Sequence, residues 1–202
     1  LLNMSVKKIL SDAASIIKLF IILLLVLTNS KADDANIKHY SEDMGTLSLM
    51  YHRFNENKYP STNIRMNVFK DQLEIIKKSK LKFYNPDEFS KNFKFSKKEK
   101  KILITIDDAF LSFYENAWPL LKKNKIPFIL FVSTEPVGKN GYMNWQQIKE
   151  VEKENFAYIG NHSHTHDYLV DLNKKEFLED IKKANKIFIK ELGYNPKYFS
   201  YP

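Results

Sequence analysis

Cysteine is absent from the 202-residue sequence, glycine occurs only five times, and arginine is represented by Arg53 and Arg65 alone. Without cysteine, disulfide-stabilised scaffolds, thiolate zinc sites and thiol nucleophiles are excluded. The formal net charge is nevertheless +8, and it comes from scattered lysines. Proteins that bind nucleic acids commonly rely on arginine for bidentate contacts, so we expect no nucleic-acid partner.

Apolar and aromatic residues are plentiful. Hydrophobic residues make up 44% of the chain and aromatic residues 14%. This content is too high for a disordered polypeptide and is sufficient for a packed core. The length suits one domain of ordinary size, or part of a larger one.

The N-terminal segment has the pattern of a secretory signal peptide. Two lysines precede the apolar run Leu19–Leu27, and Ser30 and Ala32 occupy the −3 and −1 positions of a cleavage site. A basic region, a short apolar core and small residues before the cut are the features of such a signal. We therefore predict a signal peptide over residues 1–32, followed by an N-terminal lead-in over residues 33–45.

An uncleaved membrane anchor is the alternative for this segment. Spanning a bilayer takes roughly 20 consecutive apolar residues, and Lys18 interrupts the run too early. We therefore expect a secreted, periplasmic or cell-surface protein with no stable membrane insertion after signal cleavage.

Strand-like apolar runs alternate with helical patterns along the rest of the chain. Such alternation predicts βα units and a parallel sheet, open or closed into a barrel. Because the chain ends within the last run, too few strands are present to close a (β/α) barrel, and we expect an α/β fold that is incomplete at the C-terminus. The expected strands are 47–51, 81–84, 102–106, 127–132, 156–159 and 198–201.

The expected helices have recognisable ends. Asn67, Ser112, Asn144 and Asn173 stand where polar side chains commonly cap the first turn, and Gly193 stands where the last helix is expected to end. The helices are predicted to run over residues 67–80, 112–121, 144–154 and 173–192.

Two adjacent carboxylates follow an apolar strand. Asp107 and Asp108 come directly after Ile102–Ile106, at the edge where parallel folds place their active sites. In a regular strand the two side chains would face opposite ways, so the chain must turn there if both are to reach one pocket. A solvated pair that caps the following helix is the alternative explanation.

Three of the five histidines in the chain lie close together. His162, His164 and His166 alternate with small polar residues directly after another expected strand. Imidazole suits Zn²⁺ and other first-row metals, and two histidines with one aspartate would leave an open position on the ion, as in catalytic sites. The spacing alone does not decide between His162 with His166 and His162 with His164.

These residues together resemble a known family. Thr105–Asp108, His162–His166 and Phe199–Pro202, in this order and spacing, resemble the motifs of the polysaccharide deacetylase (NodB-homology) family. Leu49–Arg53 and the Asn144–Trp145 turn resemble the branch that acts on exported poly-N-acetylglucosamine. The family fold is a distorted (β/α) barrel, which agrees with the alternation of strands and helices.

The resemblance implies a role for each matching residue. Asp107 would be the general base, and Asp108, His162 and His166 would bind one divalent metal ion, while His164 would not be a ligand. The ion would be Zn²⁺, although Co²⁺, Ni²⁺ or Fe²⁺ would also accept these ligands. The implied activity is metal-assisted hydrolysis of an N-acetyl group on a polysaccharide of the N-acetylglucosamine type, releasing acetate and leaving a free amine.

The sequence also departs from the family pattern. The resemblance covers a domain over residues 46–202, and Ser200 stands where many members have an arginine that braces the base. The tyrosine whose backbone N–H helps to bind the oxyanion and the histidine that acts as general acid would both follow Pro202. We therefore expect a C-terminally truncated domain, and a 202-residue polypeptide that is inactive on its own.

Three further residues are candidates for the substrate cleft. His52 ends the first expected strand and could line the cleft, or it could be a hydrogen-bonded structural histidine. Trp145 could stack on a sugar ring, but a tryptophan in the first turn of a helix is more often part of the core. Tyr201 lies in the third motif of the resemblance.

Two other functions compete with the deacetylase hypothesis. Barrels of the amidohydrolase type also use a pair of histidines one residue apart, but that pair ends their first strand, whereas His162 follows a late one. A degenerate barrel that binds glycan or a partner protein without catalysis is the non-enzyme alternative. The loss of the bracing arginine favours it, and the retention of all the metal-site residues argues against it.

Overall fold

The computed structural model describes residues 45–88 and 100–202, which lie in a unit that spans Ser41–Pro202. The predicted signal peptide and nearly all of the predicted lead-in fall outside the described residues. Within the described ranges, no helix has the length and apolar character needed to cross a membrane.

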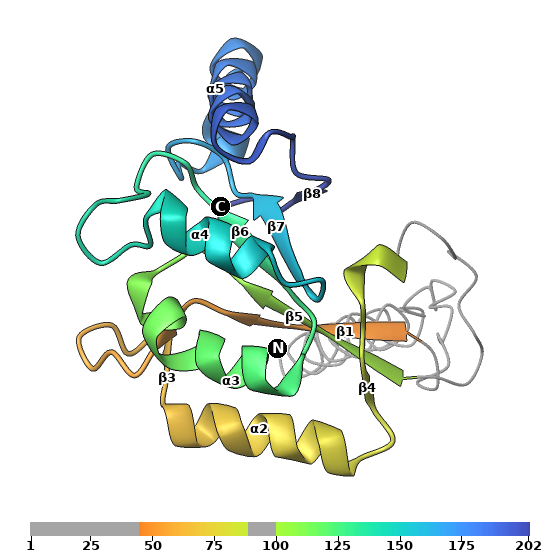
Figure 1. Ribbon diagram of the computed structural model, residues 1–202. Coiled ribbons are helices and arrows are strands. Elements are labelled where there is room, and N and C mark those ends of the chain that lie inside the picture. Colours follow the sequence, from red (N-terminus) through yellow and green to blue (C-terminus); the bar gives the residue numbers. More distant parts are fainter. Residues whose placement is uncertain (1–44, 89–99) are drawn as a thin grey trace, which may run out of the picture. The chain divides into compact units, whose positions relative to one another are not determined.

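A curled sheet of six parallel strands forms the centre of the fold, like half of a barrel (Figure 1). The strand order is β1–β5–β6–β7–β8, with β4 pairing beside β5. All six strands lie where the sequence predicts them, and the expected barrel-type fold is confirmed. The strands are β1 (Gly45–Tyr51), β4 (Lys82–Phe83), β5 (Lys100–Ile106), β6 (Phe128–Val132), β7 (Ala157–Asn161) and β8 (Tyr198–Phe199).

Strand β5 has different neighbours along its two halves. Lys101, near its start, pairs with Lys82 of β4, whereas Ile104, near its end, pairs with Phe128 of β6. On its other side β5 pairs with β1 along its whole length. The end of β5 therefore lies between the ends of β1 and β6, so residues that follow it are surrounded by other strand ends.

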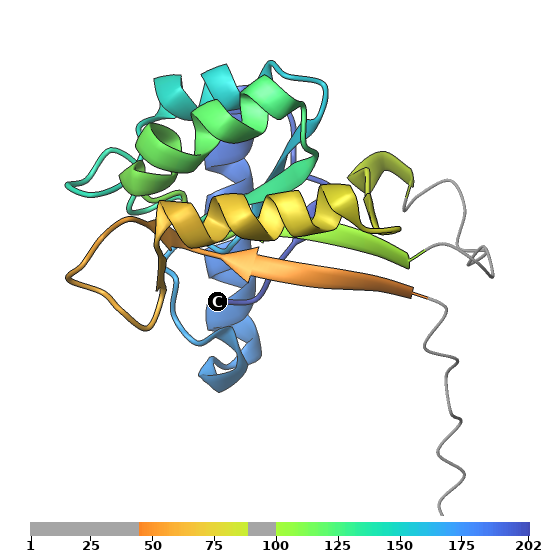
Figure 2. The ribbon, with the colours of Figure 1, turned by 90° about the horizontal axis from the view of Figure 1, so that it is seen from below.

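Helices cover one face of this sheet. Figure 2 shows α2 (Met66–Lys78), α3 (Trp118–Asn124) and α4 (Trp145–Glu152) side by side over the strands. The longest described helix is α5 (Lys174–Leu192). Apolar side chains of these helices and of β5 and β6 belong to one core cluster, and burial of this surface is the main favourable term in folding. The core includes Phe69, Leu73 and Ile76 of α2, Leu121 of α3, Ile148 and Val151 of α4, Phe188 of α5, and Ile104, Ile106, Phe128 and Leu130 of the strands.

The predicted ends of two helices are confirmed. Asn144 caps α4 in a capping box with Gln147, and Asn173 caps α5 in a capping box with Glu176. Gly193 ends α5 with a φ of 84°, a left-handed conformation that glycine adopts without steric cost.

The predicted cap of the first helix is wrong. Helix α2 begins at Met66, after the N-cap residue Arg65, so Asn67 lies inside the first turn. The N–H of Phe69 already donates to the carbonyl oxygen of Arg65, 3.0 Å away, which places the start of the helix before Asn67. The buried residues of the helix are Phe69, Leu73 and Ile76.

Two further details differ from the prediction. The predicted cap at Ser112 is also wrong, because Ser112 is itself helical and makes no side-chain cap; a π-helical turn, η2 (Phe113–Ala117), follows it and precedes α3. The segment after β1 contains a second, two-stranded parallel sheet, β2 (Arg53–Phe54) with β3 (Asn63–Ile64), which the sequence pattern did not indicate. Short 3₁₀ turns, η1 (Pro86–Glu88) and η3 (Leu169–Asp171), complete the described elements.

The cap at Asn144 and the absence of a cap at Asn67 can be tested by substitution. Asn144→Ala is expected to lower the free energy of unfolding by about 1 kcal/mol, because the amide that accepts from the Gln147 N–H is lost. Asn67→Ala is the matched control, since Asn67 is exposed within a helix and caps nothing. Urea denaturation measures both; an equal loss for the two variants would contradict the assignment.

Candidate metal centre

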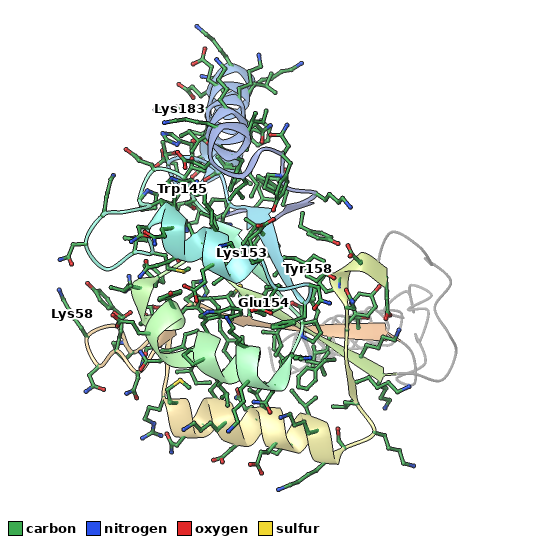
Figure 3. All side chains as sticks on the ribbon, in the orientation of Figure 1. Lys58, Trp145, Lys153, Glu154, Tyr158 and Lys183 are labelled. Carbon is green, nitrogen blue, oxygen red and sulfur yellow. The ribbon has the colours of Figure 1, made fainter. Side chains whose placement is uncertain are left out.

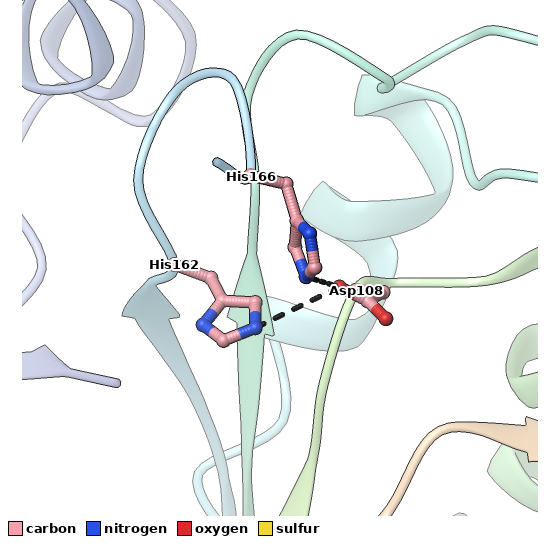
Figure 4. A group of neighbouring side chains, drawn as sticks. All are labelled: Asp108, His162 and His166. Atoms are coloured by element: carbon pink, nitrogen blue, oxygen red, sulfur yellow. Dashed lines mark ion pairs between the residues drawn. The ribbon is translucent and has the colours of Figure 1, made fainter. Parts of the chain in front are cut away.

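The ends of two strands bring the predicted metal-binding residues together. Asp108 follows β5, and His162 and His166 follow β7. One ligand atom from each of the three residues lies within 4.8 Å of the other two (Figure 4). Nε2 of His166 is 2.7 Å from Oδ1 of Asp108, and Nε2 of His162 is 3.6 Å from the same oxygen.

A backbone turn directs the aspartates into this site. Asp108 and Ala109 have φ values of 72° and 52°, in the left-handed region that residues other than glycine seldom adopt. The N–H of Asp107 donates to the carbonyl oxygen of Tyr51 at 2.8 Å, and the N–H of Met143 donates to that of Ala109 at 2.9 Å. The chain therefore turns directly after β5, as expected if both carboxylates are to reach one pocket.

An arginine stacked between two rings supports the same turn. The guanidinium carbon of Arg53 lies 3.4 Å from the centre of the Phe110 ring and 4.0 Å from that of Tyr59. The Arg53 guanidinium also pairs with Glu56 at 2.9 Å. Because Phe110 is two residues from Asp108, this cation–π stack limits the movement of the turn.

The histidine loop is held by hydrogen bonds from the ends of β6 and β7. The hydroxyl of Ser133 donates to the carbonyl oxygen of His162 at 2.7 Å, and the N–H of Ser163 donates to Oδ1 of Asn161 at 2.8 Å. The N–H of His166 donates to the hydroxyl of Ser163 at 3.1 Å. Ser163 and His166 have positive φ values of 72° and 64°, so the loop folds back and presents both imidazoles on one side.

The orientation of the first imidazole is set from the opposite side. Nδ1 of His162 lies 2.9 Å from the backbone carbonyl oxygen of Ser200, directly after β8. A carbonyl oxygen can only accept, so Nδ1 carries the proton and Nε2 presents its lone pair. A hydrogen bond from the ring nitrogen that faces away from the site to a backbone carbonyl oxygen is typical of histidines that bind metals.

Both carboxylates are buried without full compensation. Asp107 and Asp108 are 3% and 7% exposed, and Oδ1 of each accepts no hydrogen bond of correct geometry from the described residues. Nε2 of His166 lies 2.7 Å from Oδ1 of Asp108, as an ion pair when the imidazole is protonated. Buried anionic oxygens are costly unless they face a cation, so these residues fit a divalent metal ion.

The charges of the site separate the pKa values of the two aspartates. Burial, together with the negative charge of Asp108, raises the pKa of Asp107 to about 7. Burial also acts to raise the pKa of Asp108, but the nearby histidines outweigh it and hold that pKa below its ordinary value. Burial lowers the pKa of His162, which favours the neutral imidazole that a metal ion requires.

The middle histidine of the cluster is turned to another partner. Nδ1 of His164 lies 2.7 Å from the hydroxyl of Thr134, and the ring is buried. The carbonyl oxygen of His164 accepts from the N–H of Glu135 at 3.0 Å. His164 therefore helps to hold the loop through Thr134 and Glu135. The two histidines that face Asp108 are His162 and His166.

The three cleft candidates occupy different places. His52 is half-buried. Burial lowers its pKa, whereas the charge of Asp108 acts to raise it. His52 is therefore close enough to the site to interact electrostatically with Asp108. Trp145 packs edge-on against Phe188, with ring centres 5.9 Å apart, between α4 and α5 (Figure 3). Tyr201 is exposed, and its ring contacts that of Phe199 edge-on. A cleft role for each of these three stays a prediction.

One supporting residue was missed by the sequence reasoning. Asp180 on α5 is buried and accepts hydrogen bonds from the histidine loop. It lies on the buried face of the helix, which it shares with Ala184 and Phe188 at a spacing of four residues. An acidic residue on the apolar face of an amphipathic helix is the signal that could have identified it.

Comparison with known proteins identifies the family. The family profile described as "Polysaccharide deacetylase" matches residues 94–202, more than half of the chain. The chain belongs to the polysaccharide deacetylase family. This confirms the resemblance inferred from the three sequence motifs.

Two curated relatives are poly-beta-1,6-N-acetyl-D-glucosamine N-deacetylases. The alignment with the one from Staphylococcus aureus (strain MSSA476) is 188 positions long, with 29% identity, and it covers 83% of this chain and 64% of that protein. The alignment with the one from Staphylococcus epidermidis is 202 positions long, with 28% identity, and it covers 86% of this chain and 70% of that protein. The chain thus spans slightly less than two thirds of the length of the S. aureus deacetylase.

Solved structures show the same fold. IcaB from Ammonifex degensii is 30% identical and superimposes with a TM-score of 0.69, over 79% of this chain and 74% of that one. The Streptococcus pyogenes deacetylase PplD, solved with acetate, gives a TM-score of 0.68 at 23% identity, over 78% of this chain and 73% of that one. The second likeness supports the fold alone.

The predicted ligand set can be tested by titration with Zn²⁺. We expect one ion per chain, and a decrease in affinity of more than about a hundredfold for His162→Ala and for His166→Ala, because each removes a direct ligand. Asp167→Asn is the matched control, since this exposed acid adjoins His166 but is not in the ligand cluster. Isothermal titration calorimetry measures the affinities; full affinity in either histidine variant would contradict the ligand set.

Proposed function

We propose that the protein is a metal-dependent hydrolase that removes N-acetyl groups from a polysaccharide of the N-acetylglucosamine type. The observation that carries this proposal is the convergence of Asp108, His162 and His166 on one point, with the buried carboxylate of Asp107 beside them. The names of the two staphylococcal relatives support the choice of poly-N-acetylglucosamine over other acetylated polymers.

The metal ion is proposed to be Zn²⁺. Two imidazoles and one carboxylate form a ligand set that suits zinc and leaves a coordination position open, although Co²⁺, Ni²⁺ and Fe²⁺ accept the same ligands. When bound there, the ion supplies a Lewis acid next to the acetamide carbonyl and lowers the pKa of a water molecule. Burial lowers the pKa of His162, which favours the neutral imidazole, and the Ser200 carbonyl keeps its Nε2 directed at the site.

Asp107 is proposed as the general base. Its Oδ1 accepts no hydrogen bond from the described residues, so it is available for the proton of an attacking water molecule. In the metal-free protein, burial and the charge of Asp108 raise its pKa to about 7. A cation bound at Asp108 would lower this pKa again and keep Asp107 ionised at neutral pH.

Secretion is part of the proposal. The polymer substrate would be found outside the cytoplasm, and the pattern of residues 1–32 is that of a secretory signal peptide. The proposed site of action is therefore the periplasm, the cell surface or the medium.

A glycan-binding protein without catalysis is the second candidate. It is favoured by Ser200, whose side-chain hydroxyl donates to the carbonyl oxygen of Tyr201 at 3.4 Å and not to Asp107. The base therefore has no brace from this position. Release of acetate from N-acetylated poly-N-acetylglucosamine by the full-length protein would support the hydrolase; binding of the polymer without release of acetate would support the second candidate.

The role of the base can be separated from that of the ligands. In the full-length protein, Asp107→Asn is expected to lower turnover at least about a hundredfold, because the amide cannot accept the proton. The bound Zn²⁺ should be retained, since Asp107 is not in the ligand cluster. Acetate release and metal content are measured on the same preparation, with Asp167→Asn as the control; unchanged turnover would remove Asp107 from this role.

A further inference from the structure

The carboxylate of Asp180 makes three hydrogen bonds to the loop that carries the two histidines. Its Oδ1 accepts from the N–H of His164 at 2.7 Å. Its Oδ2 accepts from the N–H of Thr165 at 3.0 Å and from the hydroxyl of Thr165 at 2.8 Å. Asp180 is 8% exposed, and hydrogen bonds to a carboxylate are stronger than bonds between neutral groups.

These bonds act on the segment between the two proposed ligands. The loop contains no glycine, yet Ser163 and His166 both have positive φ values. Each such conformation is strained in a residue other than glycine. The loop therefore needs support from outside its own sequence, and Asp180 supplies it to His164 and Thr165, between the two strained positions.

We propose that Asp180 is a positioning residue of the metal centre. This inference rests on the proposed metal site. By fixing the backbone of His164 and Thr165, the carboxylate holds the loop in the conformation that directs His162 and His166 at Asp108. His162 has a second support in the Ser200 carbonyl, so the loss of Asp180 acts mainly through His166, whose side chain is 43% exposed.

The inference predicts a lower affinity for metal when the carboxylate is replaced. Asp180→Asn keeps the size of the side chain but replaces one accepting oxygen by an NH₂ group, which cannot accept from the backbone N–H that faces it. We expect the affinity of the protein for Zn²⁺ to fall about ten- to hundredfold, the range seen when outer-shell partners of metal ligands are removed. Thr165→Val removes one of the three bonds, and we expect a smaller loss of roughly threefold.

Two controls separate positioning from a general effect on folding. Glu179→Gln changes the adjacent acid on the same helix, whose exposed side chain is 4.0 Å from Lys175, and should leave the affinity for Zn²⁺ unchanged. The melting temperature of the metal-free protein reports stability alone. With Co²⁺ as a probe, the d–d absorption of the bound ion reports ligand geometry and should change in Asp180→Asn but not in Glu179→Gln.

Calorimetric titration with Zn²⁺ decides whether Asp180 positions the metal centre, whichever of three results is obtained. If folded Asp180→Asn binds Zn²⁺ within about twofold of the wild type, with an unchanged Co²⁺ spectrum, the positioning role is wrong. If Asp180→Asn does not fold, Thr165→Val decides, and an unchanged affinity there overturns the inference. If the wild-type protein binds no metal ion, the proposed metal centre fails and this inference fails with it.

Discussion

The repulsion between two adjacent buried carboxylates is the constraint around which the site is organised. Asp107 and Asp108 are held next to each other at the end of β5 with little exposure to water. Burial and mutual repulsion raise the pKa of Asp107, while the surrounding histidines keep Asp108 ionised. Such an arrangement is stable only where positive charge gathers around one of the two acids. The imidazole of His166, whose pKa the Asp108 carboxylate raises, occupies that place, and the same geometry fits a divalent cation.

Strain in the backbone is concentrated at the same place. Six described residues other than glycine have positive φ values, and four of them lie in the two segments that form the site: Asp108, Ala109, Ser163 and His166. Conformations of this kind persist where the surrounding structure determines them, and they gather at functional sites. Here the parallel sheet supplies hydrogen-bond partners to both turns, and α5 supplies a further partner, Asp180, to the histidine loop. The regular part of the fold thus stabilises the irregular part that carries the chemistry.

Patterns local in sequence predicted much of this structure. The six strands, the caps at Asn144 and Asn173, and the two motifs at the metal centre were all visible as short runs of residues. Features that depend on contacts between residues distant in sequence could not be predicted in this way. The Ser112 hydroxyl accepts from the N–H of Phe54, 58 residues away, at the point where the π-helical turn begins. Asp180 bonds to residues 15 and 16 positions earlier, and no local pattern pairs them.

Ser200, which stands where the family resemblance places an arginine, affects the proposed metal ligand His162 and the proposed base Asp107 differently. The contact of this position with the metal centre is made by the backbone carbonyl, which accepts from His162, and any residue there would provide it. A serine at this position therefore leaves the orientation of the proposed ligand His162 intact. The proposed base has no such support, because Oδ1 of Asp107 accepts no hydrogen bond from the described residues. Under the proposed function, position 200 thus bears on the base and not on the metal ligand.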